Sequence, residues 1–312
     1  MTPEILVRIE LPEEGLELLR RDFTVHYTPT PEELDTALAE LGGRIRGVVT
    51  NGTIGLTGAQ MRAMPRLEII TTRGVGYERV DTATAVDMGV IITSGKGTNA
   101  ASVADHAIGL MLAVARGIVT GDRRARERAW AQSRAPRPTI AGKRLGILGL
   151  GEIGREVARR GADGFGMQVS YHNRRRRDDV DYAYRTTPLA LAGEADFVVV
   201  CMPGGAETRG MVGRDFLEAL GPQGFLVNVG RGSVVDTAAL VDALNEGRIA
   251  GAGLDVVDGE PDIPEALLRA PNTVLTPHIA SRSPESVTAA MHRIADNMKA
   301  HFAGRPLVSR IF

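Results

Sequence analysis

The sequence contains very few cysteines and aromatic residues. Its 312 residues include a single cysteine, Cys201, so an intramolecular disulfide is excluded. Cys201 lies in the apolar run 197–202, and we expect it to be a buried thiol of a core strand. Phe, Trp and Tyr together make up 4% of the residues, which gives no indication of a large aromatic pocket. Any small-molecule ligand is therefore expected to be small and polar.

The sequence also lacks a dominant charge and a long hydrophobic run. Lys and Arg total 37 against 38 Asp and Glu, so there is no overall basic field of the kind that attracts nucleic acid. No stretch of about 18 consecutive apolar residues occurs, and the N-terminus has no basic start followed by an apolar segment. These absences predict a soluble, cytoplasmic protein with neither a membrane nor a nucleic acid as partner.

The chain does contain two series of short apolar segments that alternate with helical stretches. The first series comprises residues 4–9, 23–27, 47–50, 67–71 and 90–93, and the second comprises 145–148, 167–171, 196–202, 224–229, 251–256 and 272–275. Such alternation is typical of parallel βαβ units. The chain length suits two domains. The sequence therefore predicts an α/β protein made of two Rossmann-like domains with parallel sheets.

A glycine motif follows the first strand of the second series. Residues 144–148 run into Gly149-Leu-Gly151-Glu-Ile-Gly154 and then into a helical pattern. Gly149 permits the tight turn, Gly151 lets the backbone approach a pyrophosphate, and Gly154 lets helix and strand pack closely. The helical pattern runs from Arg155 to Arg160, and the phosphates would lie at the N-terminus of this helix. In this context the motif predicts a dinucleotide-binding site.

The residue that follows the second strand of this series indicates which dinucleotide is bound. NAD-binding folds usually carry Asp or Glu roughly 20 residues beyond the glycines, where it accepts a hydrogen bond from the ribose 2′-hydroxyl. Here Asn173 stands in that place, followed by Arg174 to Arg177. A guanidinium of Arg174 or Arg175 can grip a 2′-phosphate that a carboxylate would repel. We expect NADP(H) to be preferred over NAD(H); the alternative is a solvated basic loop, neutralised in part by Asp178 and Asp179.

Two helical segments mark the boundaries of the domains. Residues 101–118 are apolar on all sides, which is typical of a buried helix, and we expect this crossover helix to be covered either within the chain or by a second subunit. The polar stretch between Trp130 and Pro138 is expected to be a linker. Residues 284–302 form an amphipathic helix that we expect to pack on the first domain. We therefore place a substrate-binding domain at 1–100 and 284–312, and a dinucleotide-binding domain at 101–283.

Three polar residues follow the carboxyl ends of the last three strands. Arg231 follows the fourth strand of the second series, Glu260 the fifth and His278 the sixth. Ligands of open parallel sheets collect at this edge. A guanidinium can anchor a carboxylate, an imidazole can donate a proton near neutral pH, and a carboxylate keeps that imidazole charged. The set predicts catalysis of 2-oxo acid reduction, although each residue alone has a structural alternative, such as an ion pair between Arg231 and Asp255.

Taken in order, these motifs resemble the D-isomer-specific 2-hydroxyacid dehydrogenase family over nearly the whole chain. The resemblance rests on the glycine motif, Asn228-Val-Gly-Arg231, Gly253-Leu-Asp255 through Glu260-Pro261, and Pro277-His278. It implies that Arg231 binds the substrate, that Glu260 pairs with the acid-base residue His278, and that Asp255 lies near the nicotinamide or its ribose. It also implies an active site in the interdomain cleft and a homodimer with two-fold symmetry.

The resemblance extends to the residues that would line the ligands. Arg73-Gly-Val-Gly76 would supply backbone N–H groups to the substrate carboxylate, with Asn51 and Gly52 facing it. Val103-Ala-Asp-His106 would open the crossover helix near the cofactor; Asp105 replaces the more usual Glu, and His106 is interpreted as structural. The expected cofactor-binding residues are Gly149, Gly151, Glu152, Ile153, Gly154, Asn173, Arg174, Arg175, Met202, Pro203, Val229, Gly230, Asp255, Ser281 and Val103. The expected substrate-binding residues are Asn51, Gly52, Arg73, Gly74, Val75, Gly76, Arg231 and His278, and no metal is expected.

Within this family, two segments resemble the NADPH-dependent glyoxylate/hydroxypyruvate reductase branch, namely Tyr171-His-Asn-Arg-Arg175 and Gly97-Thr-Asn99. We therefore expect an oxidoreductase that transfers hydride from NADPH to glyoxylate, hydroxypyruvate or a near relative. One alternative is a reductase of larger 2-oxo acids, such as 2-ketoaldonates or hydroxyphenylpyruvate. The other is a non-catalytic NAD(P)H-sensing protein, but the retention of Arg231, Glu260 and His278 argues against it.

Overall fold

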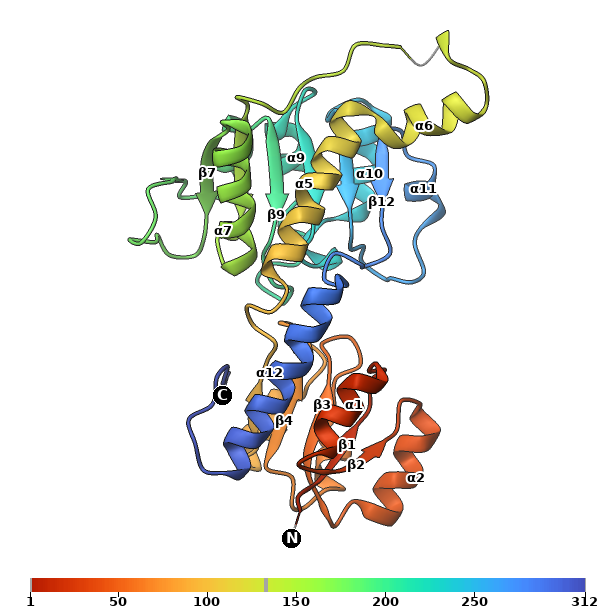
Figure 1. The fold of residues 1–312 in the computed structure, drawn as a ribbon. Helices are drawn as coiled ribbons and strands as arrows, with labels where there is room; N and C mark the ends of the chain where they lie inside the picture. The colour runs from red at the N-terminus through yellow and green to blue at the C-terminus, as the bar shows by residue number, and fades with distance from the viewer. Residues whose placement is uncertain (1, 132–133, 312) are drawn as a thin grey trace. The chain divides into compact units, whose positions relative to one another are not determined.

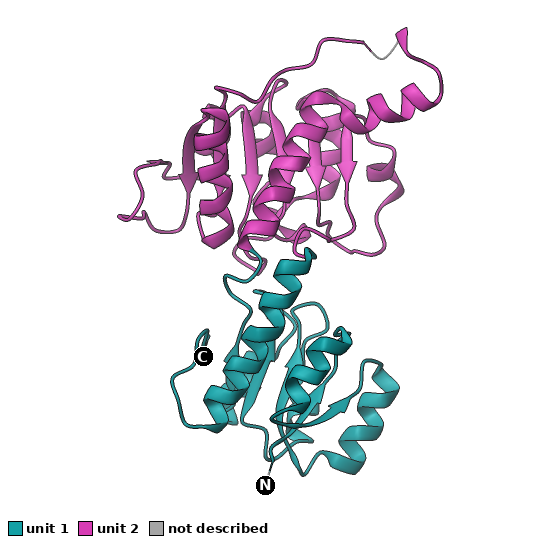
Figure 2. Cartoon of the chain, viewed as in Figure 1, with its two compact units in different colours: residues 1–99, 282–312 teal, residues 100–281 magenta. Residues whose placement is uncertain are grey.

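The structure is a computed structural model that describes residues 2–131 and 134–311, and it divides into two compact units (Figures 1 and 2). Unit 1 comprises Met1–Asn99 and Arg282–Phe312, and unit 2 comprises Ala100–Ser281. Unit 1 contains a 5-stranded sheet and unit 2 a 7-stranded sheet, and the strand pairs are parallel. The prediction of two α/β domains with parallel sheets is confirmed.

The sheet of unit 1 has the strand order β2-β1-β3-β4-β5. Its strands are β1 (Glu4–Val7), β2 (Thr24–Tyr27), β3 (Ile45–Thr50), β4 (Ile69–Thr72) and β5 (Ile91–Thr93). One face packs on α1 (Glu13–Arg20) and α12 (Pro284–Phe302), and the other on α2 (Pro31–Leu41), α3 (Gly58–Arg62) and α4 (Thr82–Asp87). Because helices cover both faces, the strands are apolar nearly throughout, and this made them recognisable in the sequence. The helix predicted over 284–302 is confirmed as α12.

The sheet of unit 2 has the strand order β12-β11-β10-β9-β6-β7-β8. Its strands are β6 (Arg144–Leu148), β7 (Gln168–His172), β8 (Ala183–Tyr184), β9 (Phe197–Val200), β10 (Phe225–Asn228), β11 (Gly251–Leu254) and β12 (Thr273–Leu275). The chain order reverses between β6 and β9, the type of position where ligands bind in such folds. The edge strand β8 was missed by sequence reasoning because two residues carry no periodic signal.

Helices cover both faces of this second sheet. One face packs on α5 (Ala100–Arg116) and α7 (Glu152–Arg159), which lie side by side in Figure 1, and the other on α8 (Pro188–Glu194), α9 (Arg214–Leu220) and α10 (Thr237–Asn245). A short π-helix, η2 (Arg160–Gly164), continues α7. A 3-10 turn, η3 (Gly232–Val234), follows β10, and α11 (Glu265–Leu268) precedes β12.

The crossover helix differs from its prediction in two respects. It ends at Arg116, where Gly117 takes a φ of 61° and α6 (Ile118–Arg126) begins, a helix that the polar sequence did not predict. Its burial is also incomplete, because Asp105, Gly109 and Arg116 form an exposed strip while the other sides are packed in the core. Within the chain, this strip is therefore not covered, and cover by a second subunit stays a prediction.

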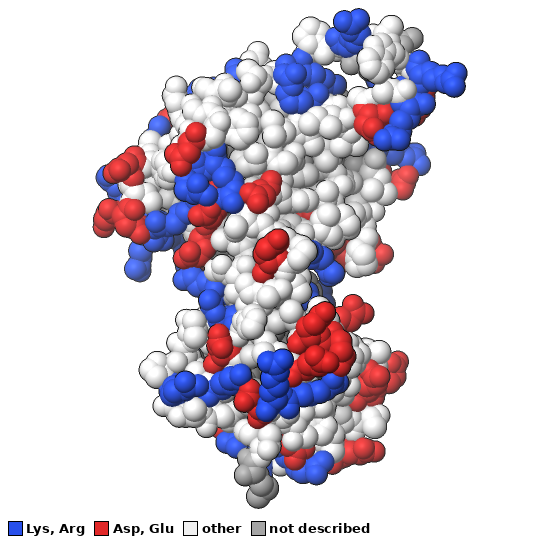
Figure 3. All heavy atoms as spheres, viewed as in Figure 1, with Lys and Arg blue, Asp and Glu red and all other residues white. Residues whose placement is uncertain are grey.

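No single helix of residues 2–131 and 134–311 is long and apolar enough to cross a membrane. Only α5 and α6 taken together pass that criterion, and they are bent by 59° at Gly117. Acidic and basic side chains lie next to one another over the face drawn in Figure 3. The linker expected between Trp130 and Pro138 includes residues 132 and 133, which lie outside the described part of the chain.

Candidate active site

The glycine motif forms the turn between β6 and α7. Gly149 has a φ of 102°, which favours glycine, and a side chain there would also lie 2.9 Å from the backbone nitrogen of Met202. A Cβ at Gly154 would lie 2.3 Å from the carbonyl oxygen of Gly149, so only glycine lets the helix begin this close to the strand. Gly151 caps α7 without a side-chain hydrogen bond, and the space beside it is open. These residues fit a pyrophosphate, since the first-turn N–H groups have no intrahelical partner.

The turns after β9 and β10 meet at the same edge. A Cβ at Gly230 would lie 2.6 Å from the carbonyl oxygen of Met202, so the two loops touch through backbone atoms. Pro203 is exposed beside Met202, and Ser281 is half-buried at the end of unit 2. Val103 and Val229 are buried together in the core under α5. The structure thus brings Gly149, Met202 and Gly230 together, while Val103 and Val229 lie in the packing beneath them.

Asn173, at the end of β7, fixes the glycine turn. Its Oδ1 accepts a hydrogen bond from the N–H of Leu150 at 2.7 Å, and its carbonyl accepts one from the hydroxyl of Tyr184 at 3.1 Å. Sequence reasoning placed Asn173 at the adenosine ribose but missed its bond to Leu150, because that contact depends on how β6 and β7 align. The residue therefore joins the glycine turn to the loop that carries the arginines.

The arginines after Asn173 differ in their surroundings. Arg174 lies 3.1 Å from Glu207, with the two side chains 86% and 77% exposed, so this ion pair contributes little. Arg177 pairs with Asp179 at 3.0 Å, and hydrogen bonds from Arg177 and Arg155 hold the pKa of the Asp179 carboxyl well below its usual range. Arg175 is exposed, and among the described residues it makes no hydrogen bond or ion pair. Arg174, next to Asn173, and Arg175, two residues beyond it, are both exposed, and theirs are the guanidinium groups of this loop that lie nearest Asn173 in sequence.

Glu260 and His278 form a hydrogen-bonded pair at the carboxyl ends of β11 and β12. The Nδ1 atom of His278 lies 2.5 Å from Oε1 of Glu260, and the N–H of Val257 donates to Oε2 of Glu260 at 3.2 Å. Burial alone would raise the pKa of Glu260, but the hydrogen bonds from His278 and Val257 outweigh burial and lower it. Glu260 therefore stays a carboxylate that orients the ring of His278, which leaves Nε2 for a ligand.

The turn that carries His278 is held by a buried carboxylate. Asp255 accepts hydrogen bonds from the hydroxyl of Thr276 at 2.7 Å, the N–H of Ile279 at 2.9 Å and the N–H of Ala280 at 3.0 Å. Burial raises the pKa of Asp255, but these bonds and one from His106 outweigh it and lower the pKa.

His278 itself has a φ of 53°, a conformation that costs a residue other than glycine about 1–3 kcal/mol. Its N–H donates to the carbonyl of Asp255 at 2.9 Å and to that of Thr276 at 3.0 Å. The surrounding hydrogen bonds therefore fix the backbone of the proposed proton donor.

Arg231 follows β10 on a loop that is fixed by Asn228. The buried side chain of Asn228 donates to the carbonyl of Arg231 and accepts from the N–H of Gly230, both at 3.0 Å. The guanidinium of Arg231 donates to the carbonyl of Gly230 at 2.8 Å. A Cβ at Gly232 would lie 2.0 Å from the backbone of Val257, so the loops after β10 and β11 are in contact. Three adjacent strands thus carry Arg231, Glu260 and His278 at one edge of the sheet.

In unit 1 the expected substrate-binding loops also touch each other. A Cβ at Gly52 would lie 2.7 Å from the carbonyl carbon of Gly76, so the loop after β3 packs on the loop after β4. Oδ1 of Asn51 accepts from the N–H groups of Thr53 and Ile54 at 3.0 and 2.7 Å, which leaves its amide nitrogen for a ligand.

The loop after β4 is anchored at its start. Arg73 donates to the carbonyl of Glu10 at 3.1 Å, and burial together with the nearby Arg282 lowers the pKa of Arg73. The N–H of Gly95 donates to the carbonyl of Gly74 at 2.8 Å, and Val75 is 39% exposed. These contacts fix the first two residues of the loop.

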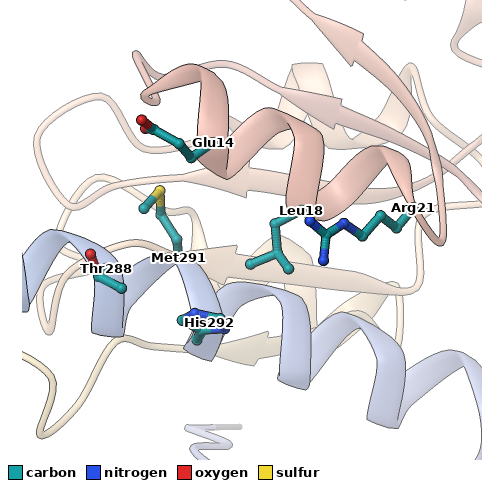
Figure 4. Close-up of a pocket in the computed structure, with 6 residues that line it drawn as sticks. All are labelled: Glu14, Leu18, Arg21, Thr288, Met291 and His292. Atoms are coloured by element: carbon teal, nitrogen blue, oxygen red, sulfur yellow. The ribbon is translucent and has the colours of Figure 1, made fainter.

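A surface pocket in unit 1 lies between α1 and α12 (Figure 4). It is lined by Glu14, Leu18, Arg21, Thr288, Met291 and His292, none of which is an expected site residue. In the described part of the chain, no group of three or more His, Cys, Asp and Glu side chains is placed to hold a metal ion.

Comparison with known proteins gives a consistent result. The family profile described as "D-isomer specific 2-hydroxyacid dehydrogenase, NAD binding domain" matches residues 108–280. The 2-ketogluconate reductase of Gluconobacter oxydans (strain 621H) is 40% identical over 312 residues, which cover 99% of this chain and 98% of that protein. The hydroxyphenylpyruvate reductase of Plectranthus scutellarioides is 39% identical over 296 residues, which cover 95% of this chain and 94% of that protein.

A solved structure shows the same fold. The NADPH-dependent glyoxylate/hydroxypyruvate reductase from Sinorhizobium meliloti, in complex with NADP and malonate, has a TM-score of 0.91 and 38% sequence identity, with 100% of this chain and 97% of that chain covered. The family predicted from the motifs is confirmed, and this chain belongs to the D-isomer-specific 2-hydroxyacid dehydrogenases.

Proposed function

We propose that this protein reduces a small 2-oxo acid, glyoxylate or hydroxypyruvate, to the 2-hydroxy acid with NADPH. The observation that carries this proposal is the hydrogen bond of 2.5 Å between His278 and the carboxylate of Glu260, at the same sheet edge as the glycine turn. Arg231, on the neighbouring strand end, would bind the substrate carboxylate and carbonyl oxygen. The N–H groups of the loop Arg73 to Gly76 would bind the same carboxylate.

The proposed reaction moves one hydride and one proton. Bound NADPH supplies the hydride to the carbonyl carbon. His278 donates the proton from Nε2 to the carbonyl oxygen, so that the C=O bond becomes a C–OH group and the imidazole is left neutral. Glu260 stabilises the charged imidazole before transfer, and Arg231 stabilises the negative charge that develops on the oxygen. Where the product is chiral, we expect the D isomer.

A larger substrate is the second candidate, because the Gluconobacter relative, 40% identical over 99% of this chain, is a 2-ketogluconate reductase. Both candidates are tested by kcat/KM with NADPH on glyoxylate, hydroxypyruvate, 2-ketogluconate and hydroxyphenylpyruvate. We expect the two small acids to give the highest values. A higher kcat/KM for 2-ketogluconate would instead indicate a reductase of larger sugar acids. Binding of NADPH without turnover of any of the four acids would favour a non-catalytic sensor.

We propose further that NADP(H) is preferred over NAD(H). The support is the absence of an acid at position 173 and the exposed guanidinium groups of Arg174 and Arg175 that follow it. A charge-assisted bond to the 2′-phosphate is worth about 1.5–3 kcal/mol, or roughly 10- to 150-fold in affinity. Arg175→Ala should lower kcat/KM for NADPH by this factor and leave that for NADH unchanged. Arg176→Ala, an equally exposed neighbour farther from Asn173, is the matched control.

We also propose that the protein is a homodimer. No residue of α6 is buried, and exposed apolar side chains lie on and beyond it, namely Ile118 at 54%, Val119 at 53% and Trp130 at 70%. Such a helix needs a covering surface, and a second copy would supply it. Sedimentation at micromolar concentration should give twice the mass of the chain, and Ile118→Glu should shift the distribution toward monomer. A monomeric wild-type protein would overturn the proposal.

A further inference from the structure

Helix α5 contacts the turn that carries His278 at two points. The hydroxyl of Ser102 donates to the carbonyl of Ala280 at 2.6 Å, and Nε2 of His106 lies 2.8 Å from the hydroxyl oxygen of Thr276. Ser102 and His106 are four residues apart, so they lie on the same side of the helix. Their two partners stand on either side of His278 in the sequence. The start of α5 therefore holds both ends of this turn, at the carboxyl edge of the sheet (Figure 1).

The hydrogen positions in this network can be assigned from its donors and acceptors. The hydroxyl of Thr276 has one hydrogen, which it donates to Oδ1 of Asp255 at 2.7 Å. Hydrogen bonds that outweigh burial lower the pKa of Asp255, so its oxygens act as acceptors only. The hydrogen shared by His106 and Thr276 must therefore belong to Nε2 of His106. The same nitrogen lies 3.3 Å from Oδ1 of Asp255.

Asp255 transmits this contact to His278. It accepts the N–H groups of Ile279 and Ala280, and its carbonyl accepts the N–H of His278 at 2.9 Å. His278 needs such restraint because its φ of 53° is disfavoured for a residue with a side chain. A hydrogen bond lost at Thr276 or Ala280 would free one end of the turn. The position of the His278 ring relative to Glu260 depends on both ends.

We propose that Ser102 and His106 are positioning residues, which hold the His278 turn in place through Thr276, Asp255 and Ala280. The role of His106 is to donate a hydrogen bond from Nε2, and no proton transfer to substrate is assigned to it. Because it assumes that His278 is the proton donor, this inference rests on the proposed function. It adds that α5 helps to set the position of His278 through His106, a residue that the sequence alone indicated to be structural.

Two substitutions of His106 separate positioning from simple packing. His106→Gln keeps an N–H donor near the place of Nε2, whereas His106→Leu removes the donor and keeps an apolar side chain. We expect His106→Leu to lower kcat for glyoxylate roughly 2- to 10-fold, as for loss of a hydrogen bond to the neutral hydroxyl of Thr276. His106→Gln should restore most of kcat, and the dissociation constant for NADPH should stay near the wild-type value in both variants.

Ser102→Ala tests the second contact. It removes a neutral hydrogen bond, for which we expect a loss of roughly 2- to 10-fold in kcat. Arg116→Gln, on the exposed strip of the same helix, is the matched control and should leave kcat unchanged. Equal kcat in His106→Leu, His106→Gln and wild type, after correction for the folded fraction, would overturn the inference.

A crystal structure of the folded His106→Leu variant tests the inference without relying on activity. We expect the turn from Thr276 to Ala280 to shift and the Nδ1 atom of His278 to lose its contact with Glu260. An unchanged turn would overturn the positioning role whatever the substrate is. Failure of wild-type protein to reduce any 2-oxo acid would instead overturn the proposed function, and the crystallographic result would still decide the role of His106.

Discussion

The variant Glu260→Gln tests whether the carboxylate of Glu260 holds His278 in place for catalysis. In Glu260→Gln the amide oxygen can still accept the N–H of Val257, which lies 3.2 Å from Oε2 in the wild type, so the loop should keep its shape. The negative charge at 2.5 Å from Nδ1 of His278 is lost. The hydrogen bond from His278 helps to lower the pKa of Glu260, so Glu260 is an ionised carboxylate where it holds the imidazole ring.

The expected effect follows from the size of this interaction. A hydrogen bond to a charged group contributes about 1.5–3 kcal/mol. At 1.36 kcal/mol per factor of ten in rate, this equals a loss of about 10- to 150-fold in kcat/KM. Both side chains are about a third exposed, at 36% and 32%, so solvent screening favours the lower end of this range. The ring of His278 loses its anchoring carboxylate in the variant, so kcat/KM for 2-oxo acid reduction should fall.

The assay is the pH profile of kcat/KM for glyoxylate reduction between about pH 5 and 9, where an imidazole titrates. Asp258→Asn is a matched control, because Asp258 lies in the same loop and pairs with Arg209 at 2.9 Å. We expect kcat/KM to fall in Glu260→Gln and to stay at the wild-type value in Asp258→Asn. Equal values for Glu260→Gln and wild type across this pH range would refute the role of Glu260.

Three further predictions concern single residues. His278→Gln should lower kcat for reduction by about 10²–10⁴-fold with NADPH binding intact, and a variant that keeps more than roughly a tenth of the wild-type kcat would exclude His278 as the proton donor. Asn173→Asp keeps an acceptor for the N–H of Leu150 but puts a carboxylate near the 2′-phosphate, so kcat/KM should fall for NADPH and rise for NADH. Equal changes for both cofactors would contradict the placement of Asn173 at the adenosine ribose. Cys201 is partly buried, and its apolar surroundings raise the pKa of the thiol to about 12, so iodoacetamide should modify it much more slowly in the native than in the unfolded protein; equal rates at pH 8 would contradict that shift.

The sequence indicated the strands well because they are buried on both faces. All eleven apolar segments proposed as strands are present with shifts of one or two residues, and the glycine turn between β6 and α7 follows from the motif. The two-residue strand β8 and the arginine-rich helix α6 have no apolar periodicity, so no pattern predicted them. Local sequence therefore specifies the core of each unit better than its edges.

The site was predictable only in part for a different reason. Residues next to strand ends, such as Glu260 and His278, are found from the position of the strands. Partners such as Leu150 for Asn173, or Thr276 for His106, depend on which atoms meet after packing, and no spacing in the sequence encodes them. The positions of Glu260 and His278 at the strand ends, and their pairing, were therefore predictable, whereas the contacts of Asn173 and His106 were not.

Steady-state oxidation of NADPH by the purified protein, with glyoxylate or hydroxypyruvate as the second substrate, tests the central proposal most directly. We predict turnover of both acids by the wild type, with a higher kcat/KM for NADPH than for NADH. Binding of NADPH with no consumption of either acid, or turnover that is faster with NADH, would contradict the proposal.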